Sequence, residues 1–187
     1  MPVVSCEESP VHPQLEEIRR VATSSLAFGQ DRSARENALT RFALAGATVA
    51  LLDGAFAVVV YVFILHLTTA GRVFQSVASG LLGKASFNGG AATVALGVAC
   101  HIFIAFSWTT VYFVASRRIA SIREFASSNV GSMITGLVFG AAMWLGMDFI
   151  VIPLSAATFT PPSSWQFWLQ LVWHIVALGP PIVRILR

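Results

Sequence analysis

Charged residues are scarce in this sequence, where Asp, Glu, Lys and Arg make up 11% of 187 residues. A soluble domain of this length carries roughly a quarter charged residues, so a water-soluble enzyme is nearly excluded. Hydrophobic residues reach 56% and the mean hydropathy is +0.73, which excludes a disordered chain, because disorder requires low hydrophobicity and high charge. The composition therefore predicts an integral membrane protein.

Cysteines and catalytic motifs are also scarce. The two cysteines, Cys6 and Cys100, form no CxxC pair, and one lies in a polar tail while the other lies in an apolar run. They are therefore expected to be too far apart to form a disulfide. The chain has no P-loop, GxSxG, kinase or dinucleotide-binding motif, and its basic residues are scattered rather than gathered on one face. This pattern predicts neither a nucleic-acid partner nor catalytic residues.

Four apolar stretches are long enough to cross the roughly 30 Å hydrocarbon core, which takes about 20 helical residues. They cover residues 42–67, 91–116, 129–152 and 165–183. Gly179-Pro180-Pro181 is expected to kink or end the last helix, because proline lacks a backbone N–H donor. The sequence thus predicts an all-α, polytopic membrane protein with a four-transmembrane-helix bundle over residues 42–187.

Two further segments are expected to be helical without crossing the membrane. The N-terminal tail, residues 1–41, contains a short amphipathic helix at 13–28, with apolar residues at helical spacing: Leu15, Ile18, Ala22 and Leu26. This helix is expected to lie on the membrane or pack under the bundle, with docking to a partner as the alternative. Residues 72–90 have an apolar core too short to span, which predicts an interfacial or re-entrant helix between the first and second spans.

The distribution of basic residues predicts the orientation of the chain. With four spans, the two tails and the second loop share one side and hold ten basic residues: Arg19, Arg20, Arg32, Arg35, Arg41, Arg117, Arg118, Arg123, Arg184 and Arg187. The opposite side holds only Arg72 and Lys84. Because Lys and Arg accumulate in cytoplasmic segments, both termini are expected in the cytoplasm.

Several motifs in residues 42–187 carry a resemblance to known proteins. They are VFQSVASGLLG followed by Phe-Asn-Gly-Gly, a histidine in the second span, MDFIVIPLS closing the third, and WHIVALGPPI in the fourth. The pattern resembles small bacterial inner-membrane proteins of unassigned function, and it is more loosely similar to the YagU-like family. That family likewise has four spans, a histidine in the second, Pro-Leu ending the third and a histidine in the last. The resemblance implies the same architecture and a bacterial inner membrane, and it brings no established reaction.

Four ionisable residues fall deep within the spans: Asp53, His101, Asp148 and His174. Such residues are costly in lipid and usually face the bundle interior, which makes them the candidate functional site. At 1.5 Å per residue, Asp53, His101 and His174 lie roughly 14–17 Å from their helix ends, near the midplane. Asp148 occupies a layer nearer the outer surface. A shared network of these side chains is therefore geometrically possible.

Small residues near these positions favour a role in helix packing. Spans one, two and three carry them at close helical spacing: Gly46, Ala50, Gly54, Gly97, Gly136 and Gly140. In lipid, small residues and interhelical hydrogen bonds hold bundles together. Small residues form a groove into which a neighbouring helix can pack. An Asp–His pair in such a groove is accordingly interpreted first as an interhelical hydrogen bond.

Three kinds of chemistry remain as alternatives. The Asp/His set could carry a proton or ion path, since histidine titrates near neutral pH. Two histidines, His101 and His174, could ligate haem b, or they could join Asp53 in a metal site, for which no sequence motif gives support. The favoured prediction has no cofactor or metal: a non-enzymatic accessory or interaction protein in the lipid bilayer, whose partner is another membrane protein or a second copy.

Overall fold

The computed structural model describes residues 13–158 and 164–187, so Cys6 and the first part of the predicted tail lie outside it. The described residues are helical with turns and contain no strand. Four helices are long and apolar enough to cross a membrane: Glu16–Ile64, Gly90–Arg118, Asn129–Val151 and Trp165–Leu186. The chain divides between Leu39 and Thr40 into two compact units. The protein is thus an all-α membrane protein with four candidate spans.

The first helix, α1, runs from Pro13 to Val58 and continues as the π-helix η1, Val59–Ile64. The short helix expected at residues 13–28 therefore does not end there. No proline follows Pro13 within α1, and an isolated glycine such as Gly29 costs a helix only about 1 kcal/mol. In the N-terminal unit the side chains of Ile18 and Phe28 are exposed.

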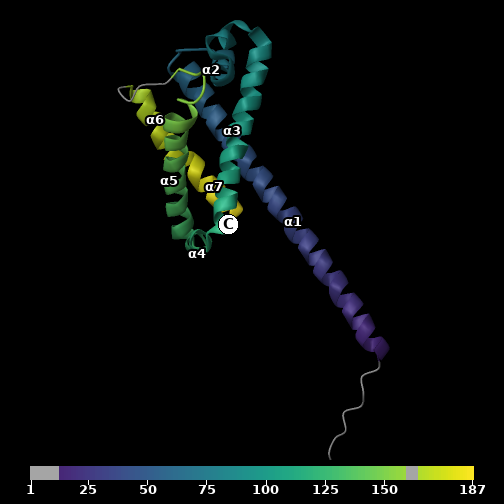
Figure 1. Cartoon of the computed structure of the whole chain (residues 1–187). Helices are drawn as coiled ribbons and strands as arrows, with labels where there is room; N and C mark the ends of the chain where they lie inside the picture. Colours follow the sequence, from purple (N-terminus) through teal and green to yellow (C-terminus); the bar gives the residue numbers. More distant parts are fainter. Residues whose placement is uncertain (1–12, 159–163) are drawn as a thin grey trace, which may run out of the picture. The chain divides into compact units, whose positions relative to one another are not determined.

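A shorter helix, α2, covers Ala70–Leu82 and leads through the 3-10 turn η2, Gly83–Asn88, into α3, Gly90–Arg118. The Thr69 hydroxyl accepts a hydrogen bond from the Arg72 N–H, which satisfies one of the free donors at the start of α2. Gly83 ends the helix at a φ of +56°, a conformation that glycine adopts without strain. Helices α2 and α3 pack against each other near the top of the view in Figure 1.

The third span begins with α5, Asn129–Gly146, and ends as the π-helix η3, Met147–Val151. Ser128 caps its start by accepting the Gly131 N–H at 2.9 Å. The short helix α4, Ala120–Ala126, lies in the preceding loop and packs against α5.

The fourth span consists of α6, Trp165–Trp173, the π-helix η4, His174–Leu178, and α7, Gly179–Leu186. The predicted span ends at residue 183, and the helix itself continues to Leu186. The prolines Pro180 and Pro181 stand in the first turn of α7, where a missing N–H donor and a fixed φ are tolerated. The helix can therefore continue past them to Leu186.

Close backbone contact joins the third and fourth spans, which lie side by side in Figure 1. A Cβ added to Gly136 would lie 2.5 Å from the Pro180 Cα, and one added to Gly140 would lie 2.2 Å from the His174 carbonyl oxygen. Likewise, a Cβ added to Gly179 would lie 1.9 Å from the Gly136 carbonyl oxygen. Around this contact lies a buried apolar core: Val49, Ala105, Tyr112, Ala126, Met143, Leu178, Ile182 and Val183.

The second compact unit, Thr40–Arg187, holds the four candidate spans and is called the membrane unit. Contacts at its two ends match a four-span path. At one end, the Ala156 N–H donates to the Gly80 carbonyl at 2.9 Å, which joins the third loop to α2. At the other end, Arg187 and the α4–α5 turn are joined by a hydrogen bond of 2.8 Å from the guanidinium to the Asn129 side-chain oxygen. Arg41, just before the first span, donates to the Arg187 carbonyl at 2.6 Å. The first and third loops thus lie at one end, and the start of span one, the second loop and the end of span four lie at the other.

Candidate functional site

The first polar pair joins α1 to α3. His101 Nδ1 lies 3.9 Å from an Asp53 carboxylate oxygen, and the His101 side chain is 14% exposed. The other ring nitrogen, Nε2, lies 2.9 Å from the Ala50 carbonyl oxygen. Because a carbonyl only accepts, Nε2 carries the hydrogen and donates it. Nδ1 is therefore the ring nitrogen that faces the carboxylate.

Small residues on α1 make this contact possible. A Cβ added to Gly54 would lie 3.2 Å from His101 Nε2, so a larger side chain would press on the ring. On the other side, the Phe74 ring of α2 meets the imidazole edge-on at 6.1 Å between centroids. The imidazole is thus held between a span and α2 by packing and by one hydrogen bond.

The second polar pair stands on the third and fourth spans, and no hydrogen bond or ion pair joins its two members in the described part of the chain. Asp148 lies in η3, is 4% exposed and interacts electrostatically with His174. His174 is the first residue of η4, and its Nδ1–H donates to the Gln170 carbonyl at 2.8 Å. The Gln170 amide in turn donates to the Tyr61 hydroxyl at 3.1 Å, which connects α6 to η1.

The four predicted site residues therefore form two pairs. Depth along the helices groups His174 with Asp53 and His101, whereas in the structure its carboxylate neighbour is Asp148. Among the described residues, no hydrogen bond or ion pair links one pair to the other. The Asp53–His101 pair instead connects α1 to α3, and Asp148 and His174 lie within electrostatic range on the third and fourth spans.

The π-helical segments are a feature that the sequence pattern does not reveal. Both members of the second pair, Asp148 and His174, lie in such segments, and a third, η1, ends the first span. A π turn adds one residue to the helical repeat and is often found at functional sites. The sequence marks Asp148 and His174 as polar residues within apolar spans, but it carries no signal for the altered turn.

Two buried indole groups could not be identified from the sequence either. The Nε1–H groups of Trp144 and Trp173 are buried and have no hydrogen-bond partner in the described part of the chain. Trp173 stacks on Phe56 of α1 at 4.3 Å, and so packs in the bundle. Trp165 and Trp168, near the start of the same span, are by contrast more than half exposed.

Two possible cofactors can be tested against these contacts. In haem proteins an imidazole nitrogen ligates the iron with its lone pair. In His101, Nε2 is committed to the Ala50 carbonyl and Nδ1 faces Asp53, so this arrangement does not fit an axial ligand. Within residues 13–158 and 164–187, no three His, Cys, Asp or Glu side chains gather closely enough to hold a metal ion.

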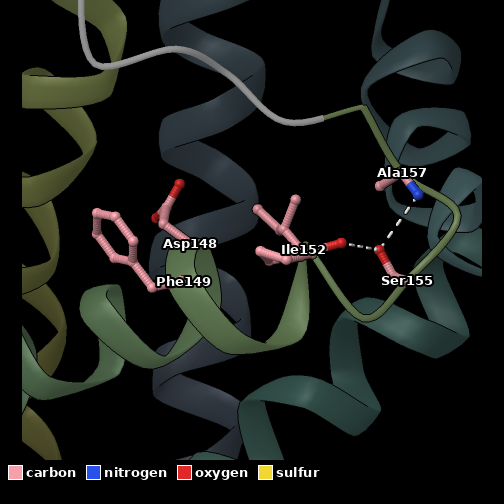
Figure 2. Close-up of a pocket in the computed structure, with 6 residues that line it drawn as sticks. Asp148, Phe149, Ile152, Ser155 and Ala157 are labelled. Atoms are coloured by element: carbon pink, nitrogen blue, oxygen red, sulfur yellow. Dashed lines mark hydrogen bonds between the residues drawn. The ribbon is translucent and has the colours of Figure 1, made fainter.

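A pocket of about 450 Å³ opens beside the second pair. It is lined by Asp148, Phe149, Ile152, Pro153, Ser155 and Ala157. Figure 2 shows Asp148 and Phe149 at the end of the third span, with Ser155 and Ala157 on the following loop and Ile152 between them. The pocket is therefore apolar apart from one carboxylate and one hydroxyl group.

The fold and these polar pairs define a class, an all-α protein with four candidate membrane spans and paired Asp and His residues between them. Comparison with protein-family models, with curated proteins and with solved structures finds no match. The function must therefore be argued from the residues of the chain itself.

Proposed function

We propose that the chain is a bacterial inner-membrane protein with both termini in the cytoplasm, which acts as a non-enzymatic accessory or interaction protein within the bilayer. In this arrangement α2 is an interfacial helix on the outer side. The end that carries Arg41, the second loop and Arg187 faces the cytoplasm, which agrees with the preference of basic residues for that side.

The observation that carries this proposal is the uncovered apolar face of the first span. In its most apolar window 11% of the residues are buried, against 33% in the third span. Leu44, Leu51 and Phe63 are each more than half exposed. Polar groups of the same helix, such as the Ala50 carbonyl, point instead into contacts within the bundle. This face is available to lipid and to another membrane protein.

Photo-crosslinking in native membranes tests the proposal. A photoreactive amino acid replaces Leu51, and the matched control replaces Leu145, which is 51% exposed on the third span. We expect a discrete protein adduct from position 51 and lipid adducts alone from position 145. Lipid adducts alone from both positions would contradict the proposal. So would turnover of a substrate by the purified protein without any partner.

A second candidate, proton or ion translocation, is favoured by the Asp53–His101 contact. His101 Nδ1 lies 3.9 Å from the carboxylate, and histidine is the side chain most often used to relay protons near neutral pH. Asp53→Asn and His101→Gln should then each abolish a pH-driven flux in liposomes while the protein remains folded. A parent protein without flux, or variants with unchanged flux, would eliminate this candidate.

A further inference from the structure

The pocket at the end of the third span has the size of a small-molecule site. Its volume of about 450 Å³ lies within the range of roughly 300–1,000 Å³ that is common for ligand pockets. Such pockets are mostly apolar with a few polar groups that orient the ligand. Here the apolar walls come from Phe149 and Ile152 and from the loop residues Pro153 and Ala157.

The carboxylate of Asp148 is the charged group of this pocket, and it is poorly compensated. Only 4% of the residue is exposed, and it makes no hydrogen bond to any described residue. Its electrostatic neighbour, His174, gives its Nδ1–H to the Gln170 carbonyl rather than to the carboxylate. A buried carboxylate without hydrogen bonds is costly, so a cation that enters the pocket gains a strong interaction.

The other polar group of the pocket is already occupied. Ser155 Oγ donates to the Ile152 carbonyl at 2.8 Å and accepts the Ala157 N–H at 3.2 Å, as the dashed lines in Figure 2 show. One carboxylate is then left for the ligand, whereas calcium and magnesium require six or more oxygen ligands. The Phe149 ring adds an aromatic surface that attracts organic cations. These features favour an organic cation over a metal ion.

We propose that this pocket binds an ammonium group attached to an apolar body, with the ammonium paired to Asp148 and the apolar body against Phe149 and Ile152. Two sources supply this chemistry: the ethanolamine headgroup of a phospholipid and a free hydrophobic amine. The site is independent of the proposed interaction face, which lies on the first span.

Calorimetric titration of the protein in phosphatidylglycerol nanodiscs tests the site. The probe is 2-phenylethylammonium, and its neutral analogue is 2-phenylethanol. We expect the ammonium to bind the parent protein at least about tenfold more tightly than the alcohol, because only the ammonium pairs with the carboxylate. Asp148→Asn should remove this preference. Asp31→Asn, the same change at an exposed position of α1, should retain it.

Ala157→Leu provides a second variant, because it narrows the pocket and leaves the carboxylate in place; we expect at least about tenfold weaker binding of the ammonium. Equal binding of the two probes by the parent protein would overturn the proposal even if a variant failed to fold. Equal affinity of the parent and Asp148→Asn would also overturn it. Competition by added phosphatidylethanolamine would identify the lipid headgroup as the source, and binding unaffected by that lipid would identify a free amine.

Discussion

At the scale of single residues, the polar and the small side chains of the spans perform one task together. His101 reaches the Ala50 carbonyl because Gly54 leaves room for the ring. Gly140 lets the backbone of the fourth span approach at the level of His174. In lipid the hydrophobic effect contributes little to the association of helices, so these close contacts and hydrogen bonds determine which helices pair.

Gly140→Ala should destabilise the bundle. The new methyl group would lie 2.2 Å from the His174 carbonyl oxygen, which belongs to a backbone that cannot rotate away. Overpacking of this kind costs about 1–3 kcal/mol, so we expect a lower melting temperature in detergent. Gly80→Ala is the control, because its methyl group would meet Ser155 at 3.8 Å. Equal melting temperatures for the two variants would contradict the packing role of Gly140.

His101→Leu should lower stability through the loss of one interhelical hydrogen bond. Such bonds contribute about 0.6 kcal/mol on average within membranes, so the expected decrease in unfolding free energy is of that order. His101→Gln retains a donor for the Ala50 carbonyl and should fall between the parent and His101→Leu. Unfolding in a denaturing detergent measures the series. A leucine variant as stable as the parent would show that the 2.9 Å contact contributes nothing.

The identity of the candidate site residues could largely be predicted from the sequence, but which of these residues lie next to each other could not. An ionisable residue in an apolar stretch indicates a bundle interior, and that argument selects Asp53, His101, Asp148 and His174. Their pairing depends on helix rotation, which the π turns at Asp148 and His174 alter. A sequence read as a regular α-helix of 3.6 residues per turn gives no indication of such a π turn.

At the scale of helices, the positions of the four spans follow from apolar length alone, and their ends depend on local backbone chemistry. The second span was predicted at residues 91–116 and observed as Gly90–Arg118. The fourth extends past Pro180 and Pro181 because a π segment precedes them and α7 begins there. Gly97 packs against α2, since a Cβ added to it would lie 1.8 Å from the Phe74 carbonyl oxygen. This contact was not predictable, because a glycine at helical spacing does not reveal which helix approaches it.

Gln75→Ala should loosen α2 from α3. Gln75 is 7% exposed, and its amide donates to Thr93 Oγ1 at 3.1 Å and to the Gly90 carbonyl at 3.3 Å. Loss of buried hydrogen bonds costs about 1–3 kcal/mol, so amide hydrogen exchange in residues 70–82 should become roughly tenfold faster. Ser76→Ala is the control, because among the described residues this hydroxyl bonds to the Val73 carbonyl of its own helix alone. Unchanged exchange in Gln75→Ala would mean that other contacts hold α2.

At the scale of the whole membrane unit, the charge distribution and the contacts between loops describe the same topology independently. Basic residues are concentrated in the tails and the second loop. The structure joins Arg41 to Arg187 at one end and Gly80 to Ala156 at the other. An even number of spans produces this arrangement, whereas an odd number would separate Arg41 from Arg187 by the thickness of the membrane.

Labelling of single cysteines tests the orientation that we propose for this topology. In a background where Cys6 and Cys100 are serine, Lys84→Cys and Ser127→Cys place one thiol at each end, both at exposed positions. With the basic end in the cytoplasm, a membrane-impermeant maleimide should label position 84 in intact cells and position 127 only after the membrane is opened. The reverse labelling pattern would mean that the protein has the opposite orientation. The Asp148 pocket, which lies beside the third loop, would then be on the cytoplasmic side. Labelling of both positions in intact cells would contradict the four-span path itself, because the two loops would then share one side.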